Sequence, residues 1–328
     1  MSIGLGADLM IKQETVYGTA VTPDVAQDFI SEGFAQSGEG VLMPKTCNGT
    51  RSLKVVLPGP YKIGGSLELL AKMEGVIPWL MKGLFGQVST TDLTGGAYRH
   101  TFTPSNSSTP ISFTVYVDKE AGQFLFPGTV VSGITIGASV EKEVTISADM
   151  MSQKVQSTTA LEATYSDVRE LIWSDAVVTL NGVSNLDVEN MSFTISQDIE
   201  MVPTHNGTRF IKRAVSKGFN VSGEFNIEFN DMTEVRRLWG ATDATSPQNT
   251  VLEGTLNVAW TSPDEIGSSG QYYALDLDFP AIFYTKGDPP VPAPDARIMQ
   301  AIGFVAKLDS EAGYDVRARI TNGVASYA

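Results

Sequence analysis

Alternating apolar and polar residues mark several stretches of the chain as β-strands with one buried face. The clearest runs are residues 111–117, with Ile, Phe, Val and Val at every second position, and residues 134–148. A period of two places successive side chains on opposite faces of a sheet, so that one face can be buried. The hydrophobic pattern therefore predicts a mainly antiparallel β-fold.

Helical spacing of apolar residues is confined to two short segments. The first carries such residues at Ile77, Leu80, Met81 and Leu84. The second runs from Met232 to Trp239 behind a potential N-cap at Asp231. Each segment is followed by a glycine, Gly86 or Gly240, which can adopt the left-handed conformation that ends a helix. We expect one short helix in each half of the chain.

The two halves also share a repeated sequence. Residues 46–69 align with residues 204–227 without a gap, at an offset of 158. A second block, residues 133–150, matches the alternation of residues 303–320 at an offset of 170, which implies a net insertion in the second copy. The proline-rich residues 287–294 are a natural place for part of it. The repeat predicts two tandem homologous domains, residues 1–163 and 164–328.

An identical tetrapeptide occurs in both copies of the repeat. The equivalent residues are Asn48, Gly49, Thr50 and Arg51 in the first copy and Asn206, Gly207, Thr208 and Arg209 in the second. Asn-Gly pairs favour tight turns because both residues tolerate a positive φ, so a simple turn is one interpretation. Turn formation does not require the threonine or the arginine, and an arginine there can reach a carboxylate of a neighbouring subunit. We therefore hypothesise an assembly contact that each chain uses twice.

The composition leaves little material for chemistry. There are 37 acidic and 23 basic residues, and the formal net charge of −14 disfavours a surface that grips phosphates. The single cysteine, Cys47, excludes an intramolecular disulfide and fits a reducing cytoplasm. Two histidines, His100 and His205, offer little for a metal or acid–base site. Motifs for a nucleophile, zinc or a phosphate loop are absent, so we expect neither an enzyme nor a bound cofactor.

No segment of the sequence is expected to enter a membrane. The most apolar stretch, Leu67–Phe85, contains four charged residues and Pro78. Each charge would cost roughly 2.5–3.5 kcal/mol at the bilayer centre. Residues 1–6 lack the basic and then apolar order of a signal peptide.

Three further stretches, Ile11–Pro23, Gly65–Gly86 and Phe126–Ile134, are similar to the major tail tube proteins of long-tailed, siphovirus-like bacteriophages. The resemblance implies two packed antiparallel sheets that close into a barrel-like β-sandwich with a flanking helix, here present as two tandem domains of tail-tube type. It implies rings that stack into a hollow tube through which DNA passes. The implied location is the virion, after assembly in the host bacterial cytoplasm.

The resemblance also implies partners and a ring size. The partners are other copies of the chain, the tail tip or baseplate, the tail terminator, and the tape measure protein and DNA in the lumen, the last two without specific binding. Many members of this family supply one domain per chain to a six-membered ring. Two domains per chain favour a trimeric ring with pseudo-sixfold symmetry, and a hexamer with the second domain on the outside is the competing arrangement.

Loops and charge lead to two further expectations. The polar segments 87–98 and 261–270 could bridge successive rings. An acidic lumen would repel DNA phosphates and let the duplex slide, although an acidic exterior for solubility explains the charge equally well.

The alternative function is a virion adhesin or a carbohydrate-binding β-sandwich. Such a module would be expected to expose aromatic residues in loops. Here Trp79 and Trp239 fall on the predicted core faces of the helices, whereas Trp173 and Trp260 lie in strand-like runs. An adhesin would remain a discrete oligomer, whereas a tube protein would polymerise.

Overall fold

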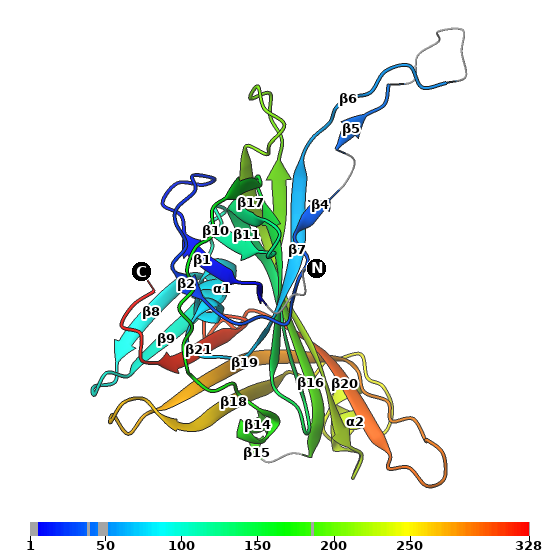
Figure 1. Cartoon of the computed structure of the whole chain (residues 1–328). Helices are drawn as coiled ribbons and strands as arrows, with labels where there is room; N and C mark the ends of the chain where they lie inside the picture. Colours follow the sequence, from blue (N-terminus) through cyan, green and yellow to red (C-terminus); the bar gives the residue numbers. More distant parts are fainter. Residues whose placement is uncertain (1–5, 38–39, 45–51, 185–186, 328) are drawn as a thin grey trace.

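One continuous antiparallel sheet runs through both halves of the chain (Figure 1). The computed structural model describes residues 6–37, 40–44, 52–184 and 187–327. We call this layer the central sheet, and its strands in spatial order are β3 (Ser31–Glu32) with β4 (Ala35–Ser37), β7 (Lys62–Leu70), β12 (Thr145–Ser152), β11 (Gln123–Ser139), β16 (Val188–Val202), β17 (Arg213–Glu228), β20 (Met299–Ala306) and β19 (Tyr272–Lys286).

The two halves of the chain join within this sheet. Gly133–Ser139 of β11 pairs with Asn190–Ser196 of β16 in antiparallel register. We call this ladder the intrachain seam. An irregular segment, residues 159–172, connects the strands of the first half to those of the second.

Each half covers the central sheet with a second layer of strands. In the first half these are β2 (Val25–Ala26), β1 (Leu9–Gln13), β10 (Ser112–Asp118), the beginning of β11 and β13 (Gln156–Thr158). In the second half they are β15 (Val183–Ser184), β14 (Ala176–Leu180), β18 (Gly254–Glu265), the beginning of β19, and β21 (Arg317–Asn322), to which the hairpin of β9 (Tyr98–Pro104) and β8 (Gly86–Asp92) adds. The predicted mainly β, sandwich-type fold is confirmed.

The core lies between these layers. Its largest fully buried side chains include Trp260, Phe102, Phe113, Phe193 and Phe225. Burying aromatic residues of this size contributes most of the hydrophobic stabilisation. The long strands β11 and β19 pass from one layer to the other, so each belongs to both sheets.

Both predicted helices are present. Helix α1 (Val76–Phe85) is almost wholly buried and packs against β11, β9 and β8, and Gly86 ends it with a φ of 75°. Helix α2 (Thr233–Leu238) follows Asp231, whose Oδ1 accepts a hydrogen bond of 2.7 Å from the backbone N–H of Thr233. Gly240 lies just beyond α2 with a φ of 96°. The glycines that follow the helices were informative in both cases. The N-cap position of α2 is occupied by Met232 and not, as expected, by Asp231, which lies one residue earlier.

The two halves have the same order of strand pairing. The first half pairs its strands in the order β1, β10, β11, β12, β7 and β4, and the second in the order β14, β18, β19, β20, β17 and β16. The registers agree as well, since Leu67 lies opposite Ala148 as Phe225 lies opposite Ile302. Equivalent residues of β7 and β17 are therefore 158 residues apart in the structure, as they are in the sequence repeat.

The second block of the sequence repeat, residues 133–150 matched to 303–320, does not agree with this pairing. Phe304 lies opposite Gly223 as Met150 lies opposite Gly65, so the topology equates β12 with β20, at an offset of 154, and not with β21. The expected offset of 170, and the net insertion it implied, are therefore wrong for these strands. Alternation with period two recurs in every half-buried strand, so it cannot distinguish neighbouring strands of one sheet.

A buried carboxylate joins three segments of the first half of the chain. Glu14 is only 6% exposed, and its two carboxylate oxygens accept four hydrogen bonds of 2.8 Å. The donors are the backbone N–H groups of Gly18 and Gly128 and the hydroxyls of Ser112 and Thr114. These contacts join the segment after β1 to β10 and to the bend within β11.

Replacing Glu14 by glutamine should destabilise the fold markedly. The amide nitrogen cannot accept the bonds that one carboxylate oxygen now accepts, so buried donors lose their partner. Hydrogen bonds to charged groups contribute about 1.5–3 kcal/mol each, and we expect the free energy of unfolding to fall by about 3 kcal/mol in a urea titration. Glu253→Gln, at an exposed position, is the control. Equal stability of the two variants would contradict this role for Glu14.

Candidate assembly surfaces

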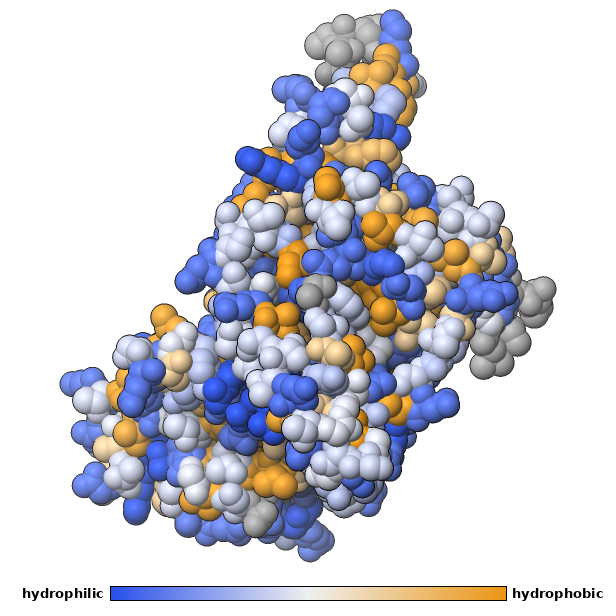
Figure 2. Space-filling view, turned by 90° about the vertical axis from the view of Figure 1, so that its left-hand side faces the viewer, coloured by the Kyte–Doolittle hydropathy of each residue, from blue (hydrophilic) through white to orange (hydrophobic). Residues whose placement is uncertain are grey.

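An arm with exposed aliphatic side chains projects from the central sheet between β4 and β7 (Figure 1). Its described part includes β5 (Val41–Leu42) and β6 (Leu57–Pro58), in which Leu42 lies opposite Leu57. Large apolar residues on the arm, each 39–56% exposed, are Val41, Leu42, Met43, Leu53, Val55, Val56 and Leu57. Figure 2 shows orange atoms among blue and white ones near the top of the molecule. Large apolar side chains exposed together on one projection often mark a site of protein contact.

Sequence reasoning did not single out this arm. Residues 53–57 fell within the repeat, and residues 41–43, before it, were not considered. The available signal was the number of apolar residues on both sides of residues 48–51. The equivalent connection in the second half is far shorter, residues 203–212 between β16 and β17.

The second Asn-Gly-Thr-Arg segment forms a turn and holds the base of the arm. Oδ1 of Asn206 accepts hydrogen bonds of 3.0 Å from both the backbone N–H and the hydroxyl of Thr208, and Gly207 has a φ of 72°. Nε of Arg209 donates to the carbonyl of Gly59 at 2.7 Å, and Nη2 donates to the carbonyl of Gly40. The guanidinium also lies 5.7 Å from the centre of the Tyr61 ring.

These contacts change the interpretation of the tetrapeptide. Thr208 does serve the turn, contrary to our expectation, because its hydroxyl completes the hydrogen bonding of Asn206. Arg209 binds two backbone carbonyls of its own chain and no carboxylate among the described residues. Asn48, Gly49, Thr50 and Arg51 lie outside the described residues. An assembly role for either tetrapeptide stays a prediction.

The two segments expected to be polar loops are hairpins. Residues 87–92 belong to β8 and residues 261–265 to β18, so only their ends turn. The turns lie against each other, since a Cβ on Gly95 would come within 2.7 Å of the Cα of Ser269. Strand β8 has polar residues on both faces and therefore lacks the alternation that reveals a half-buried strand.

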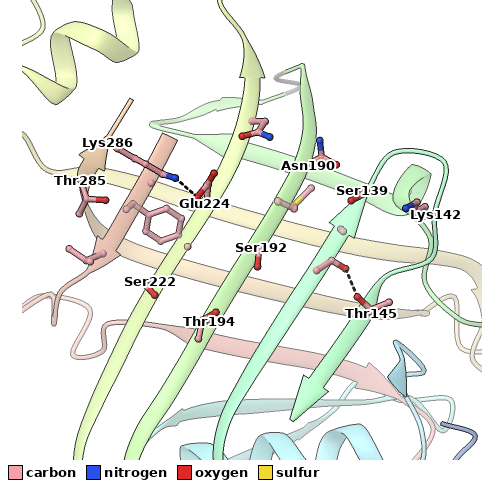
Figure 3. Close-up of a pocket in the computed structure, with 18 of the residues that line it drawn as sticks. Ser139, Lys142, Thr145, Asn190, Ser192, Thr194, Ser222, Glu224, Thr285 and Lys286 are labelled. Atoms are coloured by element: carbon pink, nitrogen blue, oxygen red, sulfur yellow. Dashed lines mark hydrogen bonds and ion pairs between the residues drawn. The ribbon is translucent and has the colours of Figure 1, made fainter. Parts of the chain in front are cut away.

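The central sheet exposes a polar face opposite its buried one (Figure 3). Glu68, Ser147, Thr135, Thr194 and Ser222 follow one another across five neighbouring strands as directly opposed residues. The hydroxyls of Thr135 and Thr194 are 3.1 Å apart, across the intrachain seam. Small hydroxyl side chains thus make a continuous row across both halves of the chain.

Charge on this face is sparse and mixed. Nζ of Lys286 lies 2.5 Å from Oε2 of Glu224 in an exposed ion pair (Figure 3). Glu68 and Asp149 add negative charge on the same face, and Lys62 adds positive charge. Glu224 and Lys286 line a shallow hollow of about 770 Å³ over β11, β16 and β17. Lys62 and Asp149 line a second hollow, of about 880 Å³, together with Asp198, Glu200 and Lys217. The surface offers neither a deep cleft nor a cluster of cations within the part of the chain described.

Of the two histidines, His100 has a structural role. Nε2 of His100 lies 2.9 Å from the carbonyl oxygen of Val324, and Nδ1 lies 2.9 Å from the hydroxyl of Thr90. Burial lowers the pKa of His100 below its ordinary value of 6.5. The imidazole ring thus connects the C-terminal segment to β8 and β9. The ring of Tyr327 packs edge-on against it, with 4.6 Å between the two ring centroids. His205 is exposed.

The tryptophans divide between core and surface. Trp260 lies in β18 and is fully buried, and Trp79 packs from α1 against Tyr327. Trp239, next to α2, is half-buried. Trp173 is 44% exposed and begins a short 3-10 turn, so its expected place in a strand is wrong.

Comparison with known proteins identifies a family. A sequence model described as phage tail tube protein matches residues 4–306. No curated protein matches the chain. Within the described ranges, no three His, Cys, Asp or Glu side chains are grouped as a metal ion would require. Neither helix in that part of the chain has the length and apolarity to cross a membrane.

Removing the Arg209 side chain should loosen the arm. Arg209→Ala deletes two charge-assisted hydrogen bonds of about 1.5–3 kcal/mol each, so backbone amides in residues 40–44 and 52–61 should exchange hydrogen at least tenfold faster. Hydrogen exchange read by mass spectrometry measures this. Arg213→Ala, on the same hairpin with an exposed side chain, is the control. Unchanged exchange in Arg209→Ala would show that the arm is held by other contacts.

Stability should depend on pH through His100. The folded state favours neutral imidazole, so the unfolded chain binds the proton more readily and stability is fully present above the unfolded pKa of about 6.5. Between pH 7 and 5.5 the free energy of unfolding should fall, and His100→Gln should flatten this slope whatever its absolute stability. His205→Gln, which replaces the other histidine of the chain at an exposed position, is the control. Identical slopes in all three proteins would contradict the assignment.

Proposed function

The chain belongs to the phage tail tube protein family, and we propose that it polymerises as stacked trimeric rings into the hollow tube that conducts DNA. Family membership makes it a structural component of the virion. The observation that carries the finer proposal is the central sheet, which contains two sets of strands with the same pairing order, side by side and joined at the intrachain seam.

The ends of the central sheet support closure into a ring. Within the described residues, Phe283–Lys286 of β19 pairs only with β20, and β3 and β4 pair only with β7. Unpaired strand edges promote association, and a closed ring removes them. Joining the β19 end of one copy to the β3–β4 end of the next would continue one sheet around a lumen.

The intrachain seam favours three chains over six. In a hexamer, the second domain would lie outside the ring that the first domains form, and its strands would not be expected to continue the sheet of the first domain. Here the two domains, residues 1–163 and 164–328 in our proposal, share one, and their strand registers superpose. Three chains would then supply six equivalent sets of strands in pseudo-sixfold symmetry.

In this arrangement the polar face of the central sheet lines the lumen. Its row of hydroxyls and its few acidic residues give DNA phosphates no cluster of cations to bind, and affinity for nucleic acid depends on such clusters. The duplex and the tape measure protein would pass without specific binding. The balance of charge on this face is only weakly acidic, so most of the net charge of −14 lies elsewhere.

The arm then becomes the contact between successive rings. It projects beyond the edge of the sandwich, and its aliphatic residues are half exposed in the single chain. Burial against the next ring would remove that surface from water. At the two ends of the tube the same surfaces would meet the tail tip or baseplate and the tail terminator.

Replacing two opposed leucines of the arm tests this function. Leu42→Ser with Leu57→Ser should keep the chain folded but prevent stacking, since each buried leucine contributes about 1.5–3 kcal/mol and a tenfold loss of association needs only 1.4 kcal/mol. The assay is sedimentation of tubes followed by negative-stain electron microscopy. Leu308→Ser, an aliphatic position 61% exposed and off the arm, is the control. Normal tubes from the arm variant would refute the stacking role.

A further inference from the structure

We propose that residues 286–292, the last residue of β19 and the start of the proline-rich connection to β20, pair with Ser31–Ser37 of the next copy of the chain. The register is that of the intrachain seam. This inference rests on the proposed ring and names the two segments that close it.

The first segment is identified by a bulge that occurs at the same place in both halves. In β11, Val131 lies opposite Met150 and Gly133 lies opposite Asp149, so one residue between them is extra. In β19, Tyr284 lies opposite Phe304 and Lys286 lies opposite Gly303, again with one extra residue. Gly133 therefore corresponds to Lys286. Because Gly133–Ser139 forms the intrachain seam, residues 286–292 occupy the equivalent position at the other end of the sheet.

The second segment is identified by its pairing with β7. Ala35 lies opposite Gly64 as Thr194 lies opposite Ser222, and Glu32 lies opposite Leu67 as Met191 lies opposite Phe225. Residues 31–37 thus correspond to Asn190–Ser196, the strand that receives β11 at the intrachain seam. Phe34 occupies the position equivalent to Phe193, and both side chains are buried. The core side of this edge is therefore already packed in the single chain.

These two correspondences fix which residues would lie opposite each other between chains. The pair Thr135 and Thr194 becomes Asp288 and Ala35, both exposed in the single chain. The pair Ala138 and Met191 becomes Val291 and Glu32. Val291 is 84% exposed, the largest exposure among the large apolar residues described, and this joint would cover it.

The sequence of the connection suits an edge that must stay open until assembly. Pro289, Pro290 and Pro292 have no N–H to donate, so this edge cannot serve as a full template for a passing strand. For the same reason the joint can form only part of the hydrogen-bond ladder of the intrachain seam, although the opposed residues are the same. In the single chain the segment turns away as a loop (Figure 1). Gly287 is buried, and its carbonyl accepts a hydrogen bond of 2.6 Å from Nε2 of Gln300. Residues 290–297 are exposed, so the part of the loop beyond Gly287 can change conformation without uncovering the core.

Engineered cysteine pairs test the joint in assembled tubes. In a Cys47→Ser background, Ala35→Cys with Asp288→Cys places two thiols directly opposite each other across the proposed joint, within the Cβ separation that a disulfide can bridge after a small adjustment. These positions lie at opposite ends of the central sheet of one chain, so a link must join different chains. Tubes would be formed under reducing conditions, oxidised, and resolved on a non-reducing denaturing gel.

We expect a ladder of linked chains that ends at the closed trimer and disappears on reduction. A second pair, Glu32→Cys with Val291→Cys, should link in the same way. The control, Ala35→Cys with Val291→Cys, is three residues out of register and should not link. Tubes in which neither in-register pair links would overturn the joint but leave the ring proposal in place. If the wild-type chain formed no tubes under the same conditions, both the joint and the ring proposal would be overturned.

Discussion

Backbone hydrogen bonding across the intrachain seam is the interaction on which the rest of the structure depends. It joins two sandwiches into one sheet and thereby sets their relative rotation. Because both halves have the same strand order, the seam also serves as a model for the contact between chains. The same pairing that stabilises one chain leaves an open edge at each end of the sheet, and unpaired edges favour association. In our proposal, closure of a ring pairs these two edges.

Two further features hold the two layers of the structure in place around the central sheet. Glu14 fixes the bend at which β11 changes layers, because its carboxylate binds Gly128 beside that bend as well as β10. Two of the stretches similar to tail tube proteins, Ile11–Pro23 and Phe126–Ile134, thus meet at one buried charge. The C-terminal segment, held by His100 and paired through β21 to β9, fastens the second half to the first in the outer layer. The two sheets are therefore joined twice, once in each layer.

The sequence was most informative where local chemistry decides the structure. Gly86 and Gly240 marked the ends of the two helices, and alternation revealed the half-buried strands. It failed where a feature depends on contacts far apart in the chain. Strand β8 is polar on both faces, the alternation of residues 303–320 matched the wrong strands, and the role of Arg209 depends on Gly40 and Gly59, more than a hundred residues earlier. The polar face could not be assigned before the strand order was known.

End-on electron microscopy of assembled tubes, averaged without imposed symmetry, tests the central claim most directly. The two halves of the chain share their order of strand pairing but differ in their arms and outer strands. If each half is one domain of the ring, as we propose, three chains should give a hollow ring of six lobes with threefold modulation. Six equal inner lobes with a second, outer layer of density would contradict the shared central sheet. Discrete particles without a lumen, under conditions that include a tail-tip nucleus, would contradict the tube itself.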